Sequence, residues 1–249
     1  MNWPVVVTRD EASDGPLSRE LRALGLAVLA WPVLRVSASA EAGALEAALR
    51  RLDDFDWVVF ASQHAVAEVV RRVRVPPAGL RVAAVGARTA QALTEAGWRV
   101  SVVPEEASAQ GLVAALAPLL PSGSRVLFPA GSRALPTLRE GLTRSGAQVL
   151  QVEAYTTTAA TLDVDACRDW VRRRAIGAVT FTSPSAVTEL DQALGASAFD
   201  QLLESASAIS LGPTTGRALA ARGHPSVLAT PATLAGLAHT TFTLLKTRP

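Results

Sequence analysis

VVFASQHAV, residues 58–66, is matched 121 positions later by VTFTSPSAV, residues 179–187. Each stretch begins as an apolar run typical of a buried β-strand and continues into a serine-containing loop. Over eleven positions the two stretches and their continuations share six identities, at Val58/Val179, Phe60/Phe181, Ser62/Ser183, Ala65/Ala186, Val66/Val187 and Glu68/Glu189. A match of this quality indicates that part of the chain is duplicated.

The duplication extends well beyond these two stretches. The same offset aligns Leu17, Leu21, Gly25, Val28 and Leu29 with Leu138, Leu142, Gly146, Val149 and Leu150. A slightly larger offset of 126 aligns VGARTAQALTEAGW (85–98) with LGPTTGRALAARGH (211–224). We therefore interpret the whole chain as an internal duplication.

Each copy alternates predicted strands and helices. The expected strands are VVVTR (5–9), AVLAWPV (27–33), WVVFAS (57–62), RVAAVG (81–86) and VSVV (100–103) in the first copy, and RVLFPA (125–130), QVLQVEAY (148–155), AVTFTS (178–183), AISLG (208–212) and SVLAT (226–230) in the second. Helices are expected over 16–24, from about 64, and over 87–96, 136–145 and 214–222, with glycines at 25, 97, 146 and 223 as helix stops. Continuous apolar strands between helices are typical of parallel sheets covered on both faces. We predict an α/β fold with two sheets of about five strands each.

Composition excludes several classes of function. The chain of 249 residues has one lysine, Lys246, and no Walker A motif, so P-loop and Schiff-base chemistry are not expected. No GxGxxG follows a strand, and neither GxSxG nor HExxH occurs. The single cysteine, Cys167, cannot form an intrachain disulfide, and the three histidines are too scattered for a metal site. We expect no cofactor and no metal.

Charge and hydropathy bear on partners and location. No apolar run reaches about 18 residues, which argues against a membrane span, and MNWPVVVTRDE reaches charged residues too early for a secretory signal. We therefore expect a cytoplasmic protein. The arginine clusters at 71–74 and 172–174 have no interleaved aromatic residues, so we interpret them as solvated helix ends and expect no nucleic-acid partner.

The loops after the strands are candidates for a ligand site. Ligands of parallel α/β sheets bind beyond the carboxyl ends of the strands, where free helix N–H groups favour anions. Six loops there carry mainly small hydroxyl residues, glycines and arginines: Thr8 and Arg9; Ser62 and Gln63; Gly86, Ala87, Arg88 and Thr89; Gly131, Ser132 and Arg133; Ser183, Pro184 and Ser185; Gly212, Pro213, Thr214 and Thr215. Each Ser or Thr taken singly could be a helix N-cap and nothing more. Together they indicate a cleft for a large polyanion.

Seven segments in order, VVVTR, WVVFASQHAV, VAAVGARTAQAL, LFPAGSRALPTL, VEAYTT, VTFTSPSAV and LGPTTGRALAARGH, give the chain a resemblance to the uroporphyrinogen-III synthase family along nearly its whole length. The resemblance implies a cofactor-independent hydro-lyase that takes hydroxymethylbilane, removes water, inverts ring D and closes the ring to uroporphyrinogen III. It also implies a monomer in transient contact with the hydroxymethylbilane synthase. Two other classes stay open: a non-catalytic polyanion-binding or regulatory protein on the same scaffold, and a periplasmic-type small-molecule receptor.

The same resemblance assigns roles to residues. Tyr155, the only tyrosine, matches a family tyrosine and would act as the acid at the leaving hydroxyl; the alternative is a buried aromatic at a domain edge. Ala61 and Gln63 depart from the Thr-Ser-Pro common among relatives, which puts side-chain contacts from that loop in doubt. Family contacts map to Ser62, Thr89, Arg133, Ser183, Thr214 and Thr215, and positions at strand ends add Arg9, Gln63, Gly86, Ser185 and Gly212.

The resemblance further implies two similar flavodoxin-like domains joined by two linkers. Residues 1–35 and 163–249 would form the first domain, and 41–156 would form an inserted second domain. The linkers would be 36–40 and 157–162, whose surrounding segments RVSASAE (35–41) and TTTAATLD (156–163) are rich in small polar residues. From the residues alone, a tandem cut near position 121 is equally allowed.

Overall fold

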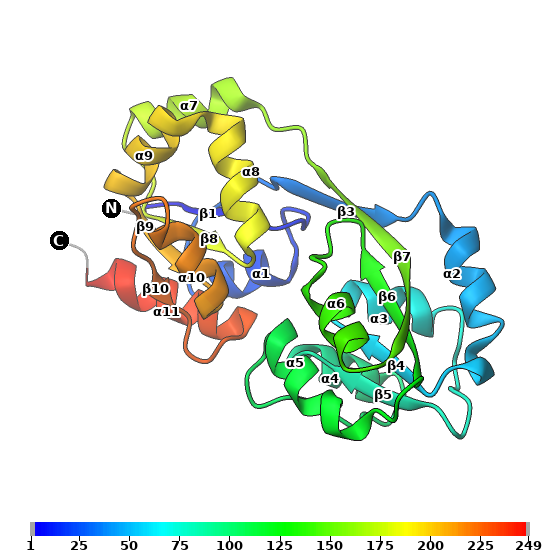
Figure 1. The fold of residues 1–249 in the computed structure, drawn as a ribbon. Coiled ribbons are helices and arrows are strands. Elements are labelled where there is room, and N and C mark those ends of the chain that lie inside the picture. Colours follow the sequence, from blue (N-terminus) through cyan, green and yellow to red (C-terminus); the bar gives the residue numbers. More distant parts are fainter. Residues whose placement is uncertain (1–2, 248–249) are drawn as a thin grey trace. The chain divides into compact units, whose positions relative to one another are not determined.

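The computed structural model describes residues 3–247, which form alternating strands and helices (Figure 1). By their internal contacts these residues divide into two compact units. Unit 1 takes the chain up to Arg35 and again from Thr158 onward, and unit 2 spans Val36–Thr157. Each unit is built on one five-stranded sheet.

Unit 1 contains a sheet, here called sheet 1, in which every strand pairing is parallel. Its strand order is β10-β9-β8-β1-β2. The strands are β1 (Val5–Val7), β2 (Val28–Ala30), β8 (Ala178–Phe181), β9 (Ser207–Ser210) and β10 (Val227–Leu228). The pairing of β1 with β8 joins parts of the chain that are distant in sequence, because Val5 lies opposite Ala178 and Val7 opposite Thr180.

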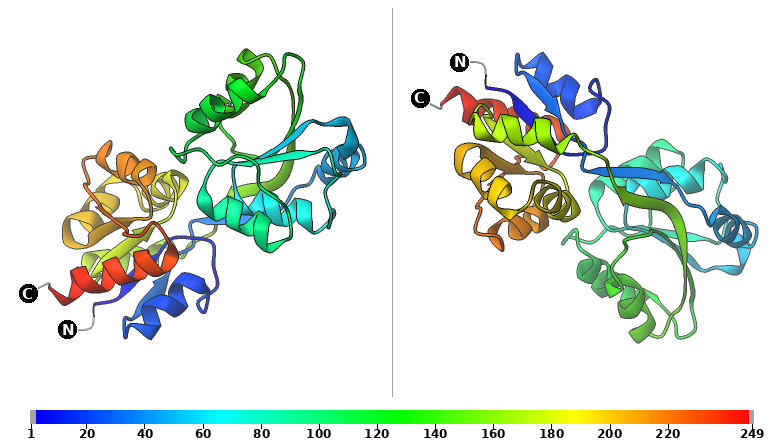
Figure 2. Two further views of the ribbon diagram at one scale, coloured as in Figure 1. Left: turned by 90° about the horizontal axis from the view of Figure 1, so that it is seen from below. Right: turned by 90° about the horizontal axis from the view of Figure 1, so that it is seen from above.

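Helices cover both faces of sheet 1, as Figure 2 shows. One face packs on α1 (Pro16–Ala23) and α11 (Leu234–Lys246), and the other on α7 (Val164–Arg172), α8 (Pro184–Leu194), α9 (Ala196–Ser205) and α10 (Pro213–Ala220). Successive strand residues alternate between the two cores: Val5 and Val7 face α1, whereas Val6 faces α8. Full burial of a side chain of this size contributes roughly 1.5–3 kcal/mol, so both faces contribute to the stability of the unit.

Unit 2 contains sheet 2, with the order β3-β7-β6-β4-β5. Its strands are β3 (Leu34–Ala38), β4 (Trp57–Phe60), β5 (Arg81–Ala84), β6 (Arg125–Gly131) and β7 (Gln148–Ala159). The pairings among β7, β6, β4 and β5 are parallel. One face packs on α2 (Ala42–Leu49), α3 (Gln63–Val70) and α4 (Ala87–Glu95), and the other on α5 (Ala109–Leu116) and α6 (Thr137–Arg144).

The duplication seen in the sequence is visible in the strand order. The run β9-β8-β1-β2 of sheet 1 corresponds to the run β5-β4-β6-β7 of sheet 2. Each strand has the same place in its run as its sequence repeat has in the other. The order of these strands along the chain differs between the units. In unit 2, β4 and β5 precede β6 and β7, whereas in unit 1 their counterparts β8 and β9 follow β1 and β2. The two copies therefore share one spatial arrangement despite a permuted connectivity.

One expected strand is not formed in full, and the segments expected as linkers contain strand residues. The strand predicted over 100–103 forms only an isolated bridge between Val102 and Ala83, and β3 supplies the fifth strand of sheet 2. The segments expected as linkers begin as strands, because β3 reaches Ala38 and β7 continues to Ala159. Three successive threonines at 156–158, two of them in the second linker, favour this extension of β7, since β-branched residues favour extended backbone.

Cys167 is a core residue of unit 1. Cys167 is buried, and burial together with the charge of Asp163 raises the pKa of its thiol to about 11. The thiol therefore stays protonated at neutral pH, as expected of an inert core residue.

None of the helices formed by residues 3–247 is both long and apolar enough to cross a membrane.

Candidate functional site

The predicted site residues lie at the carboxyl ends of the strands of the two sheets. In unit 1 they follow β1, β8 and β9, and in unit 2 they follow β4, β5 and β6 or lie on β7. Neighbouring parallel strands end on the same edge of a sheet. The structure therefore gathers two sets, one per unit: Arg9, Ser183, Ser185, Gly212, Thr214 and Thr215 in unit 1, and Ser62, Gln63, Gly86, Thr89, Arg133 and Tyr155 in unit 2.

Two predicted serines are N-caps of helices. The Ser62 hydroxyl oxygen accepts from the Ala65 N–H at 3.1 Å, and that of Ser183 accepts from the Ala186 N–H at 3.2 Å. A serine hydroxyl has one donor hydrogen besides its two acceptor lone pairs. Capping uses only the acceptor side, so each hydroxyl hydrogen can still donate to an anion at the helix N-terminus.

Two helices begin at glycines and have no side-chain cap. Gly86 precedes α4 and Gly212 precedes α10, both in extended backbone that any residue adopts. A side chain added at Gly212 would have no atom within 4 Å, so the space in front of α10 is open. The first N–H groups of a helix lack partners within it, and an uncapped open N-terminus is suited to a carboxylate.

The threonines beside these glycines divide into two kinds. Thr89 and Thr215 are buried, whereas Thr214 is exposed and accepts a weak hydrogen bond of 3.4 Å from the Arg217 guanidinium. Only Thr214 presents its side chain to solvent. Ser185, in the first turn of α8, is half-buried.

Gln63 joins the N-termini of α3 and α4. Its amide nitrogen donates to the Arg88 carbonyl at 3.2 Å, and its amide oxygen accepts from the Arg88 guanidinium at 3.3 Å. Gln63, which departs from the common family residue, thus has a structural role: both ends of its side-chain amide are hydrogen-bonded to Arg88.

Tyr155 lies on β7 beside a β-bulge. The register of β6 with β7 shifts between Ala130, opposite Glu153, and Gly131, opposite Tyr155. Bulges of this kind redirect a side chain. The half-buried Tyr155 ring packs over Gly131, whose missing Cβ would lie 2.6 Å from the ring, and its centroid is 5.4 Å from that of His64. Within residues 3–247 the Tyr155 hydroxyl makes no hydrogen bond, so it can donate to a ligand.

The loop after β6 is fastened to β7 around this tyrosine. The Ser132 N–H donates to the Tyr155 carbonyl at 3.0 Å, and the Ser132 hydroxyl accepts from the Thr157 N–H at 3.0 Å. The next residue, Arg133, is exposed. The backbone on either side of Tyr155 is thereby fixed while an arginine side chain remains at the surface.

Arg9 follows β1, and its position depends on buried threonines. The Thr8 hydroxyl donates to the Thr180 carbonyl at 2.8 Å, and the Thr180 hydroxyl donates to the Val6 carbonyl at 3.0 Å, which ties β1 to β8 at this edge. The Arg9 Nε atom lies 3.0 Å from an Oε atom of Glu11. Glu11 and His64 were not among the predicted site residues, and Gly131 was predicted only as part of its loop, because nothing local in the sequence marks their tertiary contacts.

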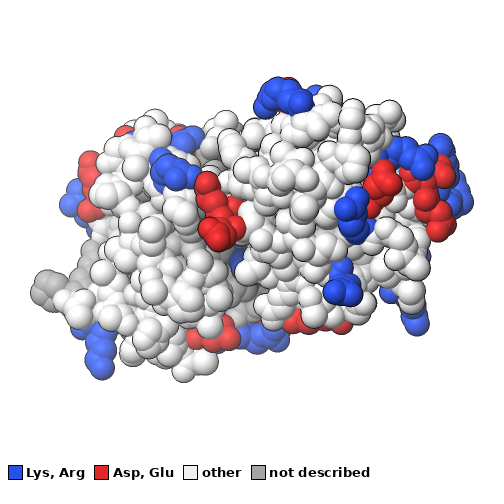
Figure 3. Space-filling model, turned by 60° about the horizontal axis from the view of Figure 1, so that its bottom comes forward, with Lys and Arg blue, Asp and Glu red and all other residues white. Residues whose placement is uncertain are grey.

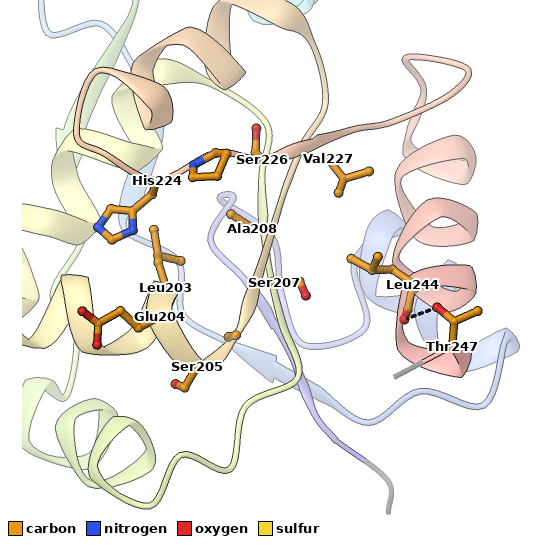
Figure 4. Close-up of a pocket in the computed structure, with 12 residues that line it drawn as sticks. Leu203, Glu204, Ser205, Ser207, Ala208, His224, Ser226, Val227, Leu244 and Thr247 are labelled. Atoms are coloured by element: carbon orange, nitrogen blue, oxygen red, sulfur yellow. Dashed lines mark hydrogen bonds between the residues drawn. The ribbon is translucent and has the colours of Figure 1, made fainter. Parts of the chain in front are cut away.

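Two cavities lie away from these loops. One of about 580 Å³ borders Ser207 and Val227, the first residues of β9 and β10, and is lined further by His224, Ser226 and Leu244 (Figure 4). Another of about 570 Å³ borders Arg125 and Gln148, the first residues of β6 and β7. Both therefore lie at the amino edges of the sheets, where helix N-termini do not converge, and we do not assign the site to them.

Charges on the surface are mixed in sign. Figure 3 shows Lys and Arg side chains interspersed with Asp and Glu on the face that it presents. One carboxylate oxygen of Glu68 lies 2.8 Å from an Nη atom of Arg71 and 2.6 Å from an Nη atom of Arg72. Burial opposes ionisation of Glu68, but the hydrogen bonds from both arginines outweigh it and hold its pKa below 4.5. Among residues 3–247, no three His, Cys, Asp or Glu side chains are grouped to hold a metal ion.

Comparison with known proteins gives these loops a context. The family model described as "Uroporphyrinogen-III synthase HemD" matches residues 15–239. The chain belongs to the uroporphyrinogen-III synthase family. A relative from Methanothermobacter thermautotrophicus is 32% identical over 231 residues, covering 90% of this chain and 91% of its own. The uroporphyrinogen-III synthase of Synechococcus elongatus is 29% identical over 225 residues, covering 85% and 83%.

Solved structures of the family agree in fold. A crystal structure of a mutant uroporphyrinogen III synthase from Thermus thermophilus aligns with a TM-score of 0.71 at 20% identity, covering 99% of this chain and 100% of that one. A Helicobacter pylori uroporphyrinogen-III synthetase aligns with a TM-score of 0.61 at 17% identity, covering 97% and 99%. The predicted membership of the family is confirmed, as is an α/β fold with two five-stranded sheets flanked by helices.

Proposed function

We propose that this protein converts hydroxymethylbilane into uroporphyrinogen III, the cyclising lyase activity of the family to which it belongs. The observation that carries the proposal is the family match over residues 15–239, nine-tenths of the chain. The strand-end loops support it, because they offer hydroxyl, guanidinium and helix N–H groups to a substrate with eight carboxylates.

The reaction requires control of geometry more than strong acid or base. Loss of the bilane hydroxyl as water leaves an electron-poor azafulvene, which ring D attacks through its substituted carbon. The spiro intermediate then fragments and recloses with ring D inverted. Because the open bilane cyclises unaided to the type I isomer, the enzyme must hold one folded arrangement, and such orientation is worth about 7–11 kcal/mol.

Roles for individual residues follow from their surroundings. We propose that substrate carboxylates bind at the uncapped N-termini behind Gly86 and Gly212 and at the hydroxyl hydrogens of Ser62 and Ser183. Gln63, Thr89, Ser185, Thr214 and Thr215 would line the same anion sites, with Arg9 and Arg133 supplying positive charge. Tyr155, whose hydroxyl has no partner within the described chain, would donate its proton to the departing hydroxyl, which leaves as water.

We also propose that the two units are two flavodoxin-like domains, the second inserted in the first. Sheet 1 has the order 2-1-3-4-5 when its strands are numbered within the unit, which is the flavodoxin order. Residues 36–40 and 157–162 would act as the two linkers.

The domain proposal predicts how fragments fold. A fragment of residues 36–157 retains four mutually paired strands and both covering helix layers, so it should unfold cooperatively in urea. A fragment of residues 1–120 should show no cooperative transition, because it separates β1 from β8 and β4 from β6. Circular dichroism measures both, and cooperative unfolding of the 1–120 fragment alone would favour a tandem division.

Instability of the substrate bears on partners. Because free hydroxymethylbilane cyclises to the wrong isomer, we propose that the enzyme works in the cytoplasm as a monomer in transient contact with the hydroxymethylbilane synthase. No nucleic acid, membrane or cofactor enters the proposed reaction. Sedimentation of the chain alone, and of the chain mixed with that synthase, would test the monomer and the contact.

The central test uses freshly prepared hydroxymethylbilane. The purified protein should yield the type III isomer with no added metal or nucleotide, and a chelator should leave the rate unchanged. Chromatographic separation of the oxidised isomers measures the outcome. A non-catalytic binding protein on the same scaffold would bind the bilane and leave type I as the product, and that result would overturn the proposal.

A further inference from the structure

The loop between β1 and α1 contains a buried carboxylate, that of Glu11. Its side chain is 3% exposed. One Oε atom accepts from the Ser18 N–H and the Ser18 hydroxyl, both at 2.7 Å, and the other accepts from the Leu17 N–H at 3.2 Å. A charge buried to this degree needs such partners, because desolvation without them is costly.

Gly15 makes this arrangement fit. It is the N-cap residue of α1 and has no side chain to cap the helix. A Cβ at this position would lie 2.5 Å from the Glu11 Cβ and 2.8 Å from its carboxyl carbon. The Glu11 carboxylate therefore occupies the N-terminus of α1 from within the protein, and that N-terminus is closed to an outside anion, unlike the open one behind Gly212.

The same carboxylate holds Arg9. The Arg9 Nε atom lies 3.0 Å from the Glu11 Oε atom that also accepts from Leu17, so the two side chains form an ion pair, although the buried Nε–H makes no hydrogen bond within residues 3–247. The Arg9 side chain is 23% exposed, and its two terminal nitrogens make no hydrogen bond or ion pair within residues 3–247. An arginine whose Nε side is paired with a buried carboxylate keeps a rigid pair of Nη donors, which match the two oxygens of a second carboxylate.

We propose that Glu11 is a positioning residue, which holds Arg9 by an ion pair on its Nε side so that the two Nη atoms bind one carboxylate of the substrate at the edge of sheet 1. The inference deepens the proposed function and rests on it. The helix N–H groups of α1 serve to orient Glu11 and take no part in substrate binding themselves. A lysine at position 9 could not replace the arginine, because its single ammonium group would be engaged by Glu11.

A double-mutant cycle on the full-length enzyme tests the proposal. Arg9→Ala should raise KM about 10- to 100-fold with little change in kcat, because a charge-assisted hydrogen bond to a non-reacting carboxylate contributes to ground and transition states alike. Glu11→Gln should raise KM about tenfold in the parent enzyme. In the Arg9→Ala background it should change KM less than about twofold, because its effect passes through Arg9.

Two controls separate positioning from folding. Arg9→Lys leaves the hydrogen bonds from Ser18 and Leu17 to Glu11 in place, so it should fold normally yet raise KM nearly as much as Arg9→Ala. Glu20→Gln removes an exposed charge from the same helix and should leave KM unchanged. Urea unfolding of every variant reports the structural cost separately from KM.

The outcomes are distinguishable. If Glu11→Gln raises KM equally in both backgrounds, or if Arg9→Lys keeps the parent KM, the positioning role is wrong. If the parent enzyme forms no type III product, the proposed function itself fails. A parent that makes type III product with a non-additive cycle supports the role of Glu11.

Discussion

Tyr155→Phe is expected to lower kcat by about 10²–10⁴-fold, the usual contribution of a positioned general acid. The substitution removes only the hydroxyl, which has no partner within residues 3–247, so unfolding stability should change by less than about 1 kcal/mol. The ring keeps its contacts with Gly131 and His64. Single-turnover formation of type III product measures the rate without interference from product release.

Substitutions in the anion-binding loops serve as the comparison. Thr214→Ala and Ser183→Ala should each lower kcat less than Tyr155→Phe, because neighbouring helix N–H groups still hold the same carboxylate. Ser183→Ala also removes an N-cap and should cost about 1 kcal/mol of stability. If Tyr155→Phe retains normal turnover while the loop variants lose it, catalysis is positioning alone and Tyr155 is not the acid.

The repeat made much of the fold predictable. Strands of continuous apolar residues and glycine helix stops are local signals, and the glycines at 25, 97, 146 and 223 all have the positive φ expected after a helix. Positions at strand ends followed directly from these elements.

Other parts of the fold carry weaker local signals. Helices α2 (AGALEAAL) and α5 (AQGLVAAL) are rich in alanine, which marks neither an apolar nor a polar face, so their periodicity is faint. The choice of β3 over residues 100–103 as a full strand of sheet 2 depends on pairing with β7. Pairings of that kind are decided by tertiary packing, which no short window of sequence contains.

The candidate site shows the same division. The residue types and their strand-end positions are visible in the sequence, but their partners are not. Whether a serine hydroxyl caps a helix, as at Ser62, or a glutamate fills one, as Glu11 does, depends on backbone placement several residues away. Long-range contacts such as that between Gly131 and Tyr155 require the bulge that aligns β6 with β7.

Gly131→Ala is expected to slow turnover about as much as Tyr155→Phe, although it leaves the hydroxyl in the protein. The new Cβ would lie 2.6 Å from the ring carbon Cζ and 2.7 Å from the hydroxyl oxygen, well inside van der Waals contact. The ring is the end of a mobile side chain, so it should swing aside and carry the hydroxyl away from the leaving group. A displacement of about 1 Å can cost about 10²-fold in rate.

Stability and a matched glycine distinguish this effect from general damage. Overpacking should cost at most about 1–3 kcal/mol, so the variant should remain folded. Gly43→Ala, in helix α2 with nothing within 4 Å of the added Cβ, should be stabilising by up to about 1 kcal/mol and keep full activity. In a Tyr155→Phe background, Gly131→Ala should slow turnover by no more than about twofold, because the group it displaces is already gone. Normal kcat in the single variant, or a full further loss in the double variant, would show that Gly131 does not act through the Tyr155 hydroxyl.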